Sequence, residues 1–240
     1  MLKTDFMVIG SKQRVASLEE DIALSLLDTE LEKVNPVKCL GVDIDEYLTW
    51  DNQMLSIRQK VTRNLGVLRR VKLFLKTEHL IVIYRSIIEP YLTYCCVVWD
   101  SISETQIVNL QKLQNCAARI ITGAFYLKRS SDILCELGWM TLEAMRKRQK
   151  AILMFKIIND LTPPYLSEMF THRASFHDYG LQSSRMNLAL PKSRKDFYRK
   201  SFAFVGAKIW NDLPNSLKEE SSLKRFMGKL DHYYDQHQQN

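Results

Sequence analysis

The feature that most constrains the fold is a long amphipathic stretch that begins near Asp51, which is placed to cap the start of a helix. Its apolar side chains recur at steps of three and four residues, and this spacing predicts a helix with one buried face. The apolar stripe consists of Met54, Ile57, Val61, Leu65 and Leu68. Between residues 52 and 77 the chain has seven Lys or Arg side chains and no Asp or Glu. A helix with one apolar face and one cationic face favours contact with phosphate groups.

Five basic residues of this stretch are the candidate nucleic-acid-binding residues. Arg63 and Arg70 lie one heptad apart and are expected to project opposite the apolar stripe, while Arg58, Lys60 and Arg69 flank it. The alternative is a solvated helix face whose charges only keep the protein in solution. We favour phosphate contact because acidic residues are missing from the whole stretch.

Two more helices are expected to pack against the first. One begins at Thr77 and ends before Pro90, and its centre at residues 80–84 is apolar all round, which predicts burial. Residues 103–106 form a capping box that opens a third helix, and Gly123 is suited to end it. The third helix has a core face made of Ile107, Leu110, Leu113, Ala117 and Ile121.

The two ends of the chain have different patterns. Residues 6–9 and 37–44 are short apolar runs that predict strands, with an acidic helix over residues 17–32 between them. After residue 126 the pattern predicts a long helix from Thr141 to about residue 159, then helices over residues 196–211 and 222–234. We therefore expect a mainly α protein with a small N-terminal β element.

Short segments spread along the chain carry a family resemblance. They are KTDFMVIG at 3–10, KCLGVDID at 38–45, LTW at 48–50, IEPY at 88–91, LQKLQ at 110–114 and WNDLP at 210–214. Together they resemble the C-terminal portion of reverse transcriptases from non-LTR retrotransposons of the LINE class, in the jockey-like group. The resemblance implies a palm remnant with a primer-grip-like hairpin at 1–50, a thumb-like three-helix bundle at 51–125 and a helical C-terminal module at 126–240.

The resemblance also bears on catalysis. In that family an aspartate pair lies upstream of the Lys-Thr-x-Phe segment, and this sequence has no two adjacent aspartates. We therefore expect a truncated or remnant RNA-directed DNA polymerase with no catalytic residues, no metal site and no cofactor. The expected partner is RNA or an RNA/DNA duplex, bound weakly through its backbone, with no membrane and no small-molecule substrate. The alternatives are a helical protein-interaction module without a nucleic-acid role, and a gene fragment without a stable fold.

Charge is unevenly distributed along the 240 residues, whose net charge is +7. Residues 1–50 contain five basic and ten acidic side chains, whereas each of the next three blocks of fifty contains eight basic and four acidic ones. Within the basic region, residues 146–150 and 192–200 hold two further clusters, and the second surrounds Phe197 and Tyr198. Such a region favours a polyanion, nucleic acid first and an anionic membrane second.

Cysteines and acidic pairs give no metal or disulfide signal. The five cysteines include no Cys-x-x-Cys spacing, which predicts reduced thiols. The chain also has no apolar run of about 18 residues, the length needed to span a membrane. Reduced thiols and the lack of such a run together predict an intracellular protein of the nucleus or cytoplasm that is not secreted. Asp43 and Asp45 share one strand face and could together hold a cation, but two oxygen ligands are few for a hard cation. We favour a solvated or loop-facing edge of a half-buried strand for both.

Overall fold

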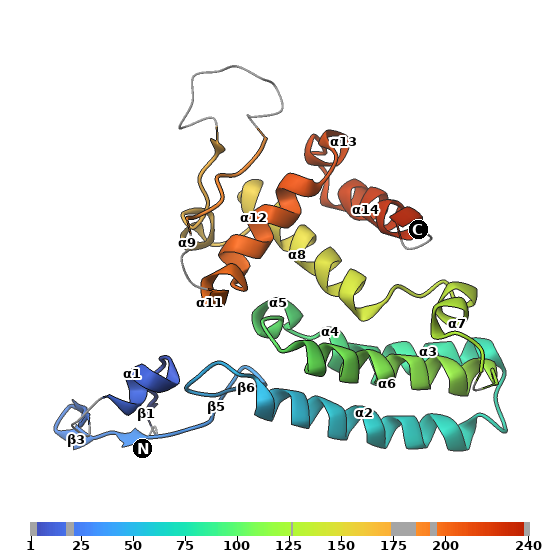
Figure 1. The fold of residues 1–240 in the computed structure, drawn as a ribbon, viewed down its shortest axis with the longest axis horizontal. Coiled ribbons are helices and arrows are strands. Elements are labelled where there is room, and N and C mark those ends of the chain that lie inside the picture. Colours follow the sequence, from blue (N-terminus) through green and yellow to red (C-terminus); the bar gives the residue numbers. More distant parts are fainter. Residues whose placement is uncertain (1–3, 18–21, 126, 174–185, 193–195, 238–240) are drawn as a thin grey trace.

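The computed structural model describes residues 4–17, 22–125, 127–173, 186–192 and 196–237 (Figure 1). It is mainly α with a small N-terminal β element, which confirms the predicted fold class. The helices are α1 Lys12–Ala16, α2 Asp51–Val71, α3 Thr77–Ile87, α4 Glu89–Thr93, α5 Cys96–Trp99, α6 Glu104–Thr122, α7 Ser130–Glu136, α8 Leu142–Ile158, α9 Pro164–Ser167, α11 Asp196–Arg199, α12 Phe202–Asp212, α13 Asn215–Lys218 and α14 Leu223–His237. The strands are β1 Asp5–Phe6, β2 Ser25–Leu26, β3 Thr29–Glu30, β4 Glu32–Lys33, β5 Val37–Cys39 and β6 Val42–Ile44.

The central bundle is built around α2, α3 and α6, as the helical periodicity predicts. Helix α2 lies along one edge of the molecule and packs against α6 and α3 (Figure 1). Helix α6 starts at the predicted capping box, in which Ser103 and Gln106 each accept a hydrogen bond from the other's backbone N–H. It ends at Gly123, whose φ of 70° is a left-handed conformation that glycine adopts without strain.

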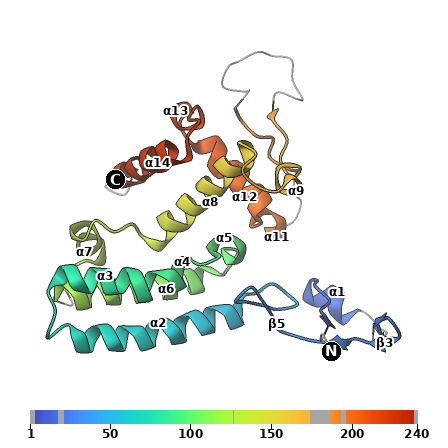
Figure 2. The same ribbon diagram turned by 180° about the vertical axis from the view of Figure 1, so that it is seen from behind.

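A second core lies in the C-terminal half and shares α8 with the bundle. Leu142, at the start of α8, belongs to the bundle core, whereas Ala151 and Phe155 further along pack with Trp210 and Phe226 of α12 and α14. The Phe155 and Phe226 rings are stacked with their centroids 4.4 Å apart. Helix α8 therefore connects the two cores, and Figure 2 shows it between the bundle and the C-terminal helices.

The N-terminal segment extends away from the bundle beyond the start of α2 (Figures 1 and 2). Its strands form three separate two-stranded pairs, β1 with β4, β2 with β3 and β5 with β6. The β5–β6 hairpin turns at Leu40 and Gly41, both with positive φ, as a two-residue hairpin turn requires. The hairpin is attached to the bundle through buried Val42 and through a 2.8 Å hydrogen bond from the Tyr94 hydroxyl to the Leu40 carbonyl.

Several N-terminal predictions are wrong. The predicted helix over 17–32 is replaced, in its described part, by the β2–β3 hairpin, whose turn has Leu27 and Asp28 at positive φ. A short polar Asp tolerates that left-handed conformation, and no described residue from 22 to 32 is buried against a core that could hold a helix. The predicted strand at 6–9 is limited to β1, and the single strand predicted at 37–44 is a hairpin broken by Gly41.

Three helix predictions also need correction. Trp50, not Asp51, occupies the N-cap of α2, and Asp51 is its first helical residue. Helix α3 is not buried all round, since Leu80 and Tyr84 face the core while Val82 is 61% exposed. The helix predicted over 196–211 is divided into α11 and α12, because Ser201 adopts an extended conformation between them.

The predicted division at residues 50 and 125 stays a prediction, and the bundle core also includes Ile133 and Trp139 from beyond the second boundary. Within the described residues, no helix combines the length and the apolar character needed to cross a membrane.

Candidate nucleic-acid interface

The start of α2 is fixed by the loop that precedes it. The Asp45 carboxylate accepts backbone N–H bonds from Tyr47, Thr49 and Trp50, at 3.1, 3.0 and 2.8 Å. Burial raises the pKa of this carboxyl, but the hydrogen bonds from Thr49, Trp50 and Tyr47 outweigh burial, and the pKa lies below its usual value. Gln53 adds a further tie by accepting a 3.0 Å bond from the backbone N–H of Asp43. Asp45 therefore acts as a structural anchor for the loop.

The apolar face of α2 orients the rest of the helix. All five residues of the predicted stripe are buried, with Val61 and Leu68 at 0% exposure. Because residues on opposite faces of a helix point in opposite directions, burial of this stripe turns the other side of α2 to solvent. The packing of one face thus decides where the cations lie.

The structure places the predicted cations where the sequence analysis expects them. Arg58, Arg63, Arg69 and Arg70 are exposed, and none of them forms an ion pair with a residue that the structure describes. Lys60 is half-buried, and its ammonium group lies 5.6 Å from the centre of the Tyr91 ring in α4. Four of the five cations are therefore available to a ligand without breaking a described ion pair.

Apolar side chains are exposed at the C-terminal end of this face. In the loop from α2 to α3, Leu73 and Phe74 are 83% and 84% exposed. They directly follow Arg69, Arg70 and Lys72 in the sequence. An aromatic ring next to cations is suited to stacking on an unpaired base, and equally to an apolar contact with a protein. Sequence analysis missed this loop because two apolar residues between helices carry no periodic signal.

The basic cluster at residues 146–150 does not form a cationic face. Arg146 and Lys150 are buried and both pair with Asp100, which lies between α5 and α6. Arg148 pairs with Asp231 of α14, and exposed Lys147 lies 2.7 Å from Glu143. These cations form ion pairs within the protein, and the sequence analysis predicted none of these pairs.

The basic cluster at residues 192–200 is described only in part by the structure. Lys192, Arg199 and Lys200 are exposed, as is Tyr198, whereas Arg194, Lys195 and the side chain of Phe197 lie outside the described residues. Trp210 is 2% exposed and donates a 2.9 Å bond to the Met186 carbonyl. Among the described residues, no group of three or more His, Cys, Asp or Glu side chains is arranged to hold a metal ion.

Comparison with known proteins gives one informative relative. A stretch of 113 residues is 32% identical to the probable RNA-directed DNA polymerase from transposon X-element of Drosophila melanogaster. The chain is related to the reverse transcriptases of non-LTR retrotransposons. The match covers 45% of this chain and 12% of the fly protein. No family model matches the chain. No solved structure matches it either.

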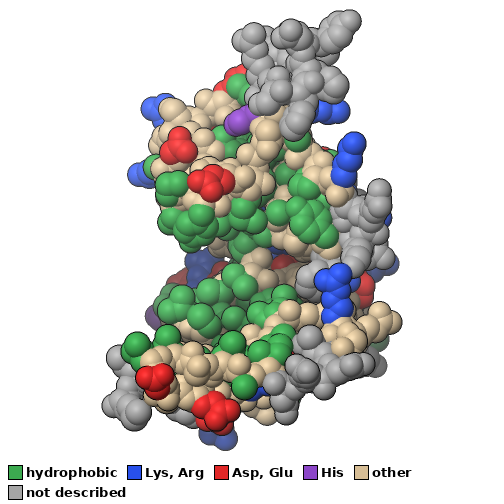
Figure 3. All heavy atoms as spheres, turned by 90° about the vertical axis from the view of Figure 1, so that its left-hand side faces the viewer, with side chains coloured by type: hydrophobic (Ala, Val, Ile, Leu, Met, Phe, Trp, Pro, Cys, Tyr) green, Lys and Arg blue, Asp and Glu red, His purple; other side chains and the backbone are tan. Residues whose placement is uncertain are grey.

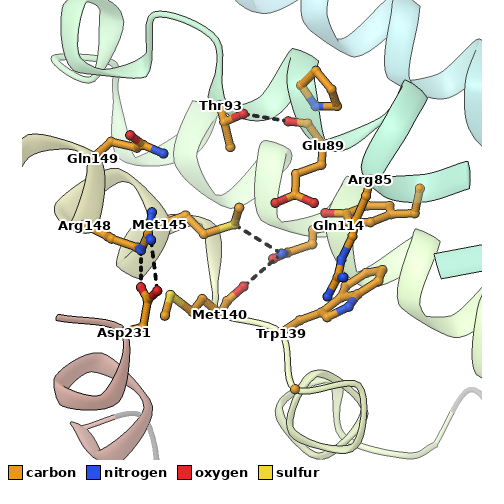
Figure 4. Close-up of a pocket in the computed structure, with 13 residues that line it drawn as sticks. Arg85, Glu89, Thr93, Gln114, Trp139, Met140, Met145, Arg148, Gln149 and Asp231 are labelled. Carbon is orange, nitrogen blue, oxygen red and sulfur yellow. Dashed lines mark hydrogen bonds and ion pairs between the residues drawn. The ribbon is translucent and has the colours of Figure 1, made fainter. Parts of the chain in front are cut away.

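A cavity of about 610 Å³ lies where the bundle of this transposon-related chain meets the C-terminal helices (Figure 4). Arg85, Glu89 and Gln114 of the bundle point into it, and the Arg148–Asp231 pair closes one side. Burial raises the pKa of the Glu89 carboxyl, and Arg85 opposes that rise. No His, Cys or Ser is among its described lining residues, and the hydroxyl of Thr93, which also lines the cavity, donates its hydrogen bond to the backbone carbonyl of Glu89. We assign no chemistry to it.

Proposed function

We propose that the chain binds the sugar-phosphate backbone of RNA or an RNA/DNA duplex through the exposed face of α2. The observation that carries the proposal is a 21-residue helix whose apolar face is buried and whose opposite face holds exposed arginines without a described acidic partner. The relation to an RNA-directed DNA polymerase supports a nucleic-acid partner over other polyanions.

The physical basis is the release of counterions from the nucleic acid. Each phosphate that a Lys or Arg neutralises releases condensed cations, so the logarithm of affinity falls linearly with the logarithm of salt concentration. The slope is about 0.7 to 0.9 per phosphate contact. Backbone contacts of this kind carry no sequence information, so we expect weak binding that does not discriminate between sequences.

We also propose that this chain alone does not polymerise DNA. The resemblance implies a catalytic aspartate pair, and the sequence has no two adjacent aspartates. Two-metal phosphoryl transfer needs carboxylates that hold both ions around the attacking and leaving oxygens. Primer extension on an RNA template with magnesium or manganese is the test, and template-dependent product above a heat-inactivated control would overturn this part of the proposal.

The test of binding is a double substitution, Arg63→Gln with Arg70→Gln. Both side chains are exposed, so the fold should remain intact, while the salt slope should fall by about 1.4 to 1.8 if each makes one phosphate contact. Lys112→Gln with Lys224→Gln removes the same charge from exposed sites outside α2 and serves as the matched control. Fluorescence anisotropy with a mixed-sequence RNA/DNA duplex over a range of salt concentrations gives both slopes. Equal slopes for the α2 variant and the parent would refute the proposal.

A second candidate function is a helical protein-interaction module. The exposed Leu73 and Phe74 favour it, because apolar side chains with more than four-fifths exposure are typical of contact surfaces. Binding to a protein through apolar contacts would be insensitive to salt. It would be lost on Phe74→Ser and retained in the Arg63→Gln, Arg70→Gln variant.

A further inference from the structure

A second cavity, of about 480 Å³, lies where the bundle meets α8, α11 and α12. Its volume is within the roughly 300 to 1,000 Å³ that small-molecule sites occupy. On the side of the molecule that Figure 3 shows, the surface is hollowed between its upper and lower parts, with Lys and Arg side chains beside the hollow. Its lining includes Asp100, Glu143, Arg146, Lys150, Lys200 and Lys208.

Two cations share one carboxylate at the inner end of this cavity. The side chains of Arg146 and Lys150 are 3% and 6% exposed, and that of Asp100 is 15% exposed. Arg146 Nε lies 2.5 Å from one Asp100 oxygen, and Lys150 Nζ contacts the other. Two buried positive charges therefore share one carboxylate in direct contact. Glu143 also attracts Arg146, but it is exposed, so the buried groups themselves carry an excess of one positive charge.

Such an excess is costly in a protein interior. A buried charge without a partner loses its hydration and gains no compensating attraction. The guanidinium of Arg146 also has unused donors, because its buried Nη1 forms no hydrogen bond with any described residue. An unpartnered donor on a buried cation that lines a cavity indicates that the cavity accommodates an anion.

The other charged groups around the cavity do not reverse this sign. Of its fifteen lining residues, six are Lys or Arg and four are Asp or Glu. Of the outer acids, Glu143 lies against Lys147, which lines the same cavity. Lys200 and Lys208 are both exposed, so they stand at the rim with the buried cations behind them. The cavity therefore has cations both at its entrance and in its interior.

We propose that this cavity is a phosphate-binding site, in which Arg146 and Lys150 contact a phosphate group that enters past Lys200 and Lys208. Arg146 offers the planar donor geometry that suits phosphate oxygens, and the Lys ammonium groups add point charges. The group has two sources, a phosphate of a nucleic-acid backbone or a free phosphate ester. The site is separate from the exposed face of α2 and does not depend on the function proposed for that face.

The first test uses inorganic phosphate as the probe, on the full chain at constant ionic strength with chloride as the reference. Thermal unfolding should show a rise in Tm of about 5 to 10 °C when phosphate exceeds its Kd a hundredfold. Lys200→Gln with Lys208→Gln should weaken phosphate affinity at least about tenfold, since each substitution removes a charge-assisted hydrogen bond to the phosphate. The Lys112→Gln, Lys224→Gln variant removes equal charge elsewhere and should keep the parent affinity. Isothermal titration measures these affinities directly.

A conservative substitution inside the cavity tests the site in a variant that should remain folded. Arg146→Lys keeps the buried charge but loses the guanidinium donors, so it should remain folded and bind phosphate about tenfold more weakly. The proposal is overturned if phosphate raises Tm no more than chloride does. It is also overturned if both cavity variants bind phosphate as tightly as the parent does.

Competition identifies the source of the phosphate group. If a mixed-sequence RNA/DNA duplex displaces inorganic phosphate, the site accepts a backbone phosphate. If a free 5′-mononucleotide displaces inorganic phosphate and the duplex does not, the site accepts a free ester. Either result supports the proposal that the cavity binds phosphate. The Arg63→Gln, Arg70→Gln variant should bind inorganic phosphate normally, so failure of the α2 proposal leaves this test unaffected.

Discussion

Replacing Asp100 by Asn tests how much the buried charge cluster contributes to stability. The substitution keeps the size of the side chain and removes the negative charge that both Arg146 and Lys150 contact. Both cations are nearly fully buried, at 3% and 6% side-chain exposure, so solvent screens them little. The variant would therefore hold two buried positive charges with no carboxylate between them.

The size of the expected stability loss follows from this arrangement of buried charges. Breaking a buried ion pair by removing one partner costs about 3 to 5 kcal/mol, because the other charge stays buried and uncompensated. The Asn oxygen still accepts one hydrogen bond, so we expect a loss of unfolding free energy near the lower end, about 3 kcal/mol. For a chain of this length that corresponds to a fall in Tm of roughly 6 to 12 °C. Asp100→Ala, which keeps no acceptor, should cost more.

Urea unfolding followed by circular dichroism measures both variants. Asp160→Asn is the matched control, since Asp160 is exposed at a positive φ that Asn also tolerates, and it should change stability by less than about 0.5 kcal/mol. Adding Lys150→Met to Asp100→Asn should recover part of the loss, because it removes one of the two uncompensated charges. A cost below about 1 kcal/mol for Asp100→Asn, within reach of ordinary surface substitutions, would refute the reasoning about uncompensated charge.

Two further predictions concern packing and thiol reactivity. Gly206→Ala should cost about 1 to 3 kcal/mol in urea unfolding, because the added Cβ would lie 2.8 Å from the Met154 sulfur. Gly228→Ala in α14 meets no atom within 4 Å and should instead stabilise by about 0.5 to 1 kcal/mol, so equal effects at the two glycines would contradict the packing. Burial, with Asp100 nearby, raises the pKa of the Cys96 thiol to about 11, so iodoacetamide should label exposed Cys39 well before Cys96 in the folded protein. Mass spectrometry of the labelled peptides measures the order, and equal labelling would show that Cys96 is accessible.

The bundle could be predicted because its signals are local. Five apolar residues at helical spacing are enough to define which face of α2 is buried, and the structure buries all five. The capping box at Ser103 and the glycine at residue 123 fix both ends of α6 through bonds within one turn. The outward direction of Arg63 and Arg70 follows from the same periodicity.

The N-terminal segment could not be predicted in the same way. No described residue from 22 to 41 is buried, so no core face imposes a period on this part of the sequence. Its acidic residues are compatible with a helix, but most helical stability in proteins comes from packing an apolar face. Turn chemistry at Asp28 and Gly41 decides the outcome instead, and those signals involve single residues.

The basic residues of α2 and α8 look alike in the sequence yet have opposite environments, and the difference lies in their partners. In α2 the cations stand opposite a clear apolar stripe, so the helix itself turns them to solvent. In α8, Arg146 and Lys150 are four residues apart, a spacing at which like charges repel on an isolated helix. They are buried together only because the contact between α5 and α8 brings Asp100, 50 residues before Lys150, between them. Because that contact depends on the fold of two distant segments, the α8 cluster could only be recognised as a site once its environment was known.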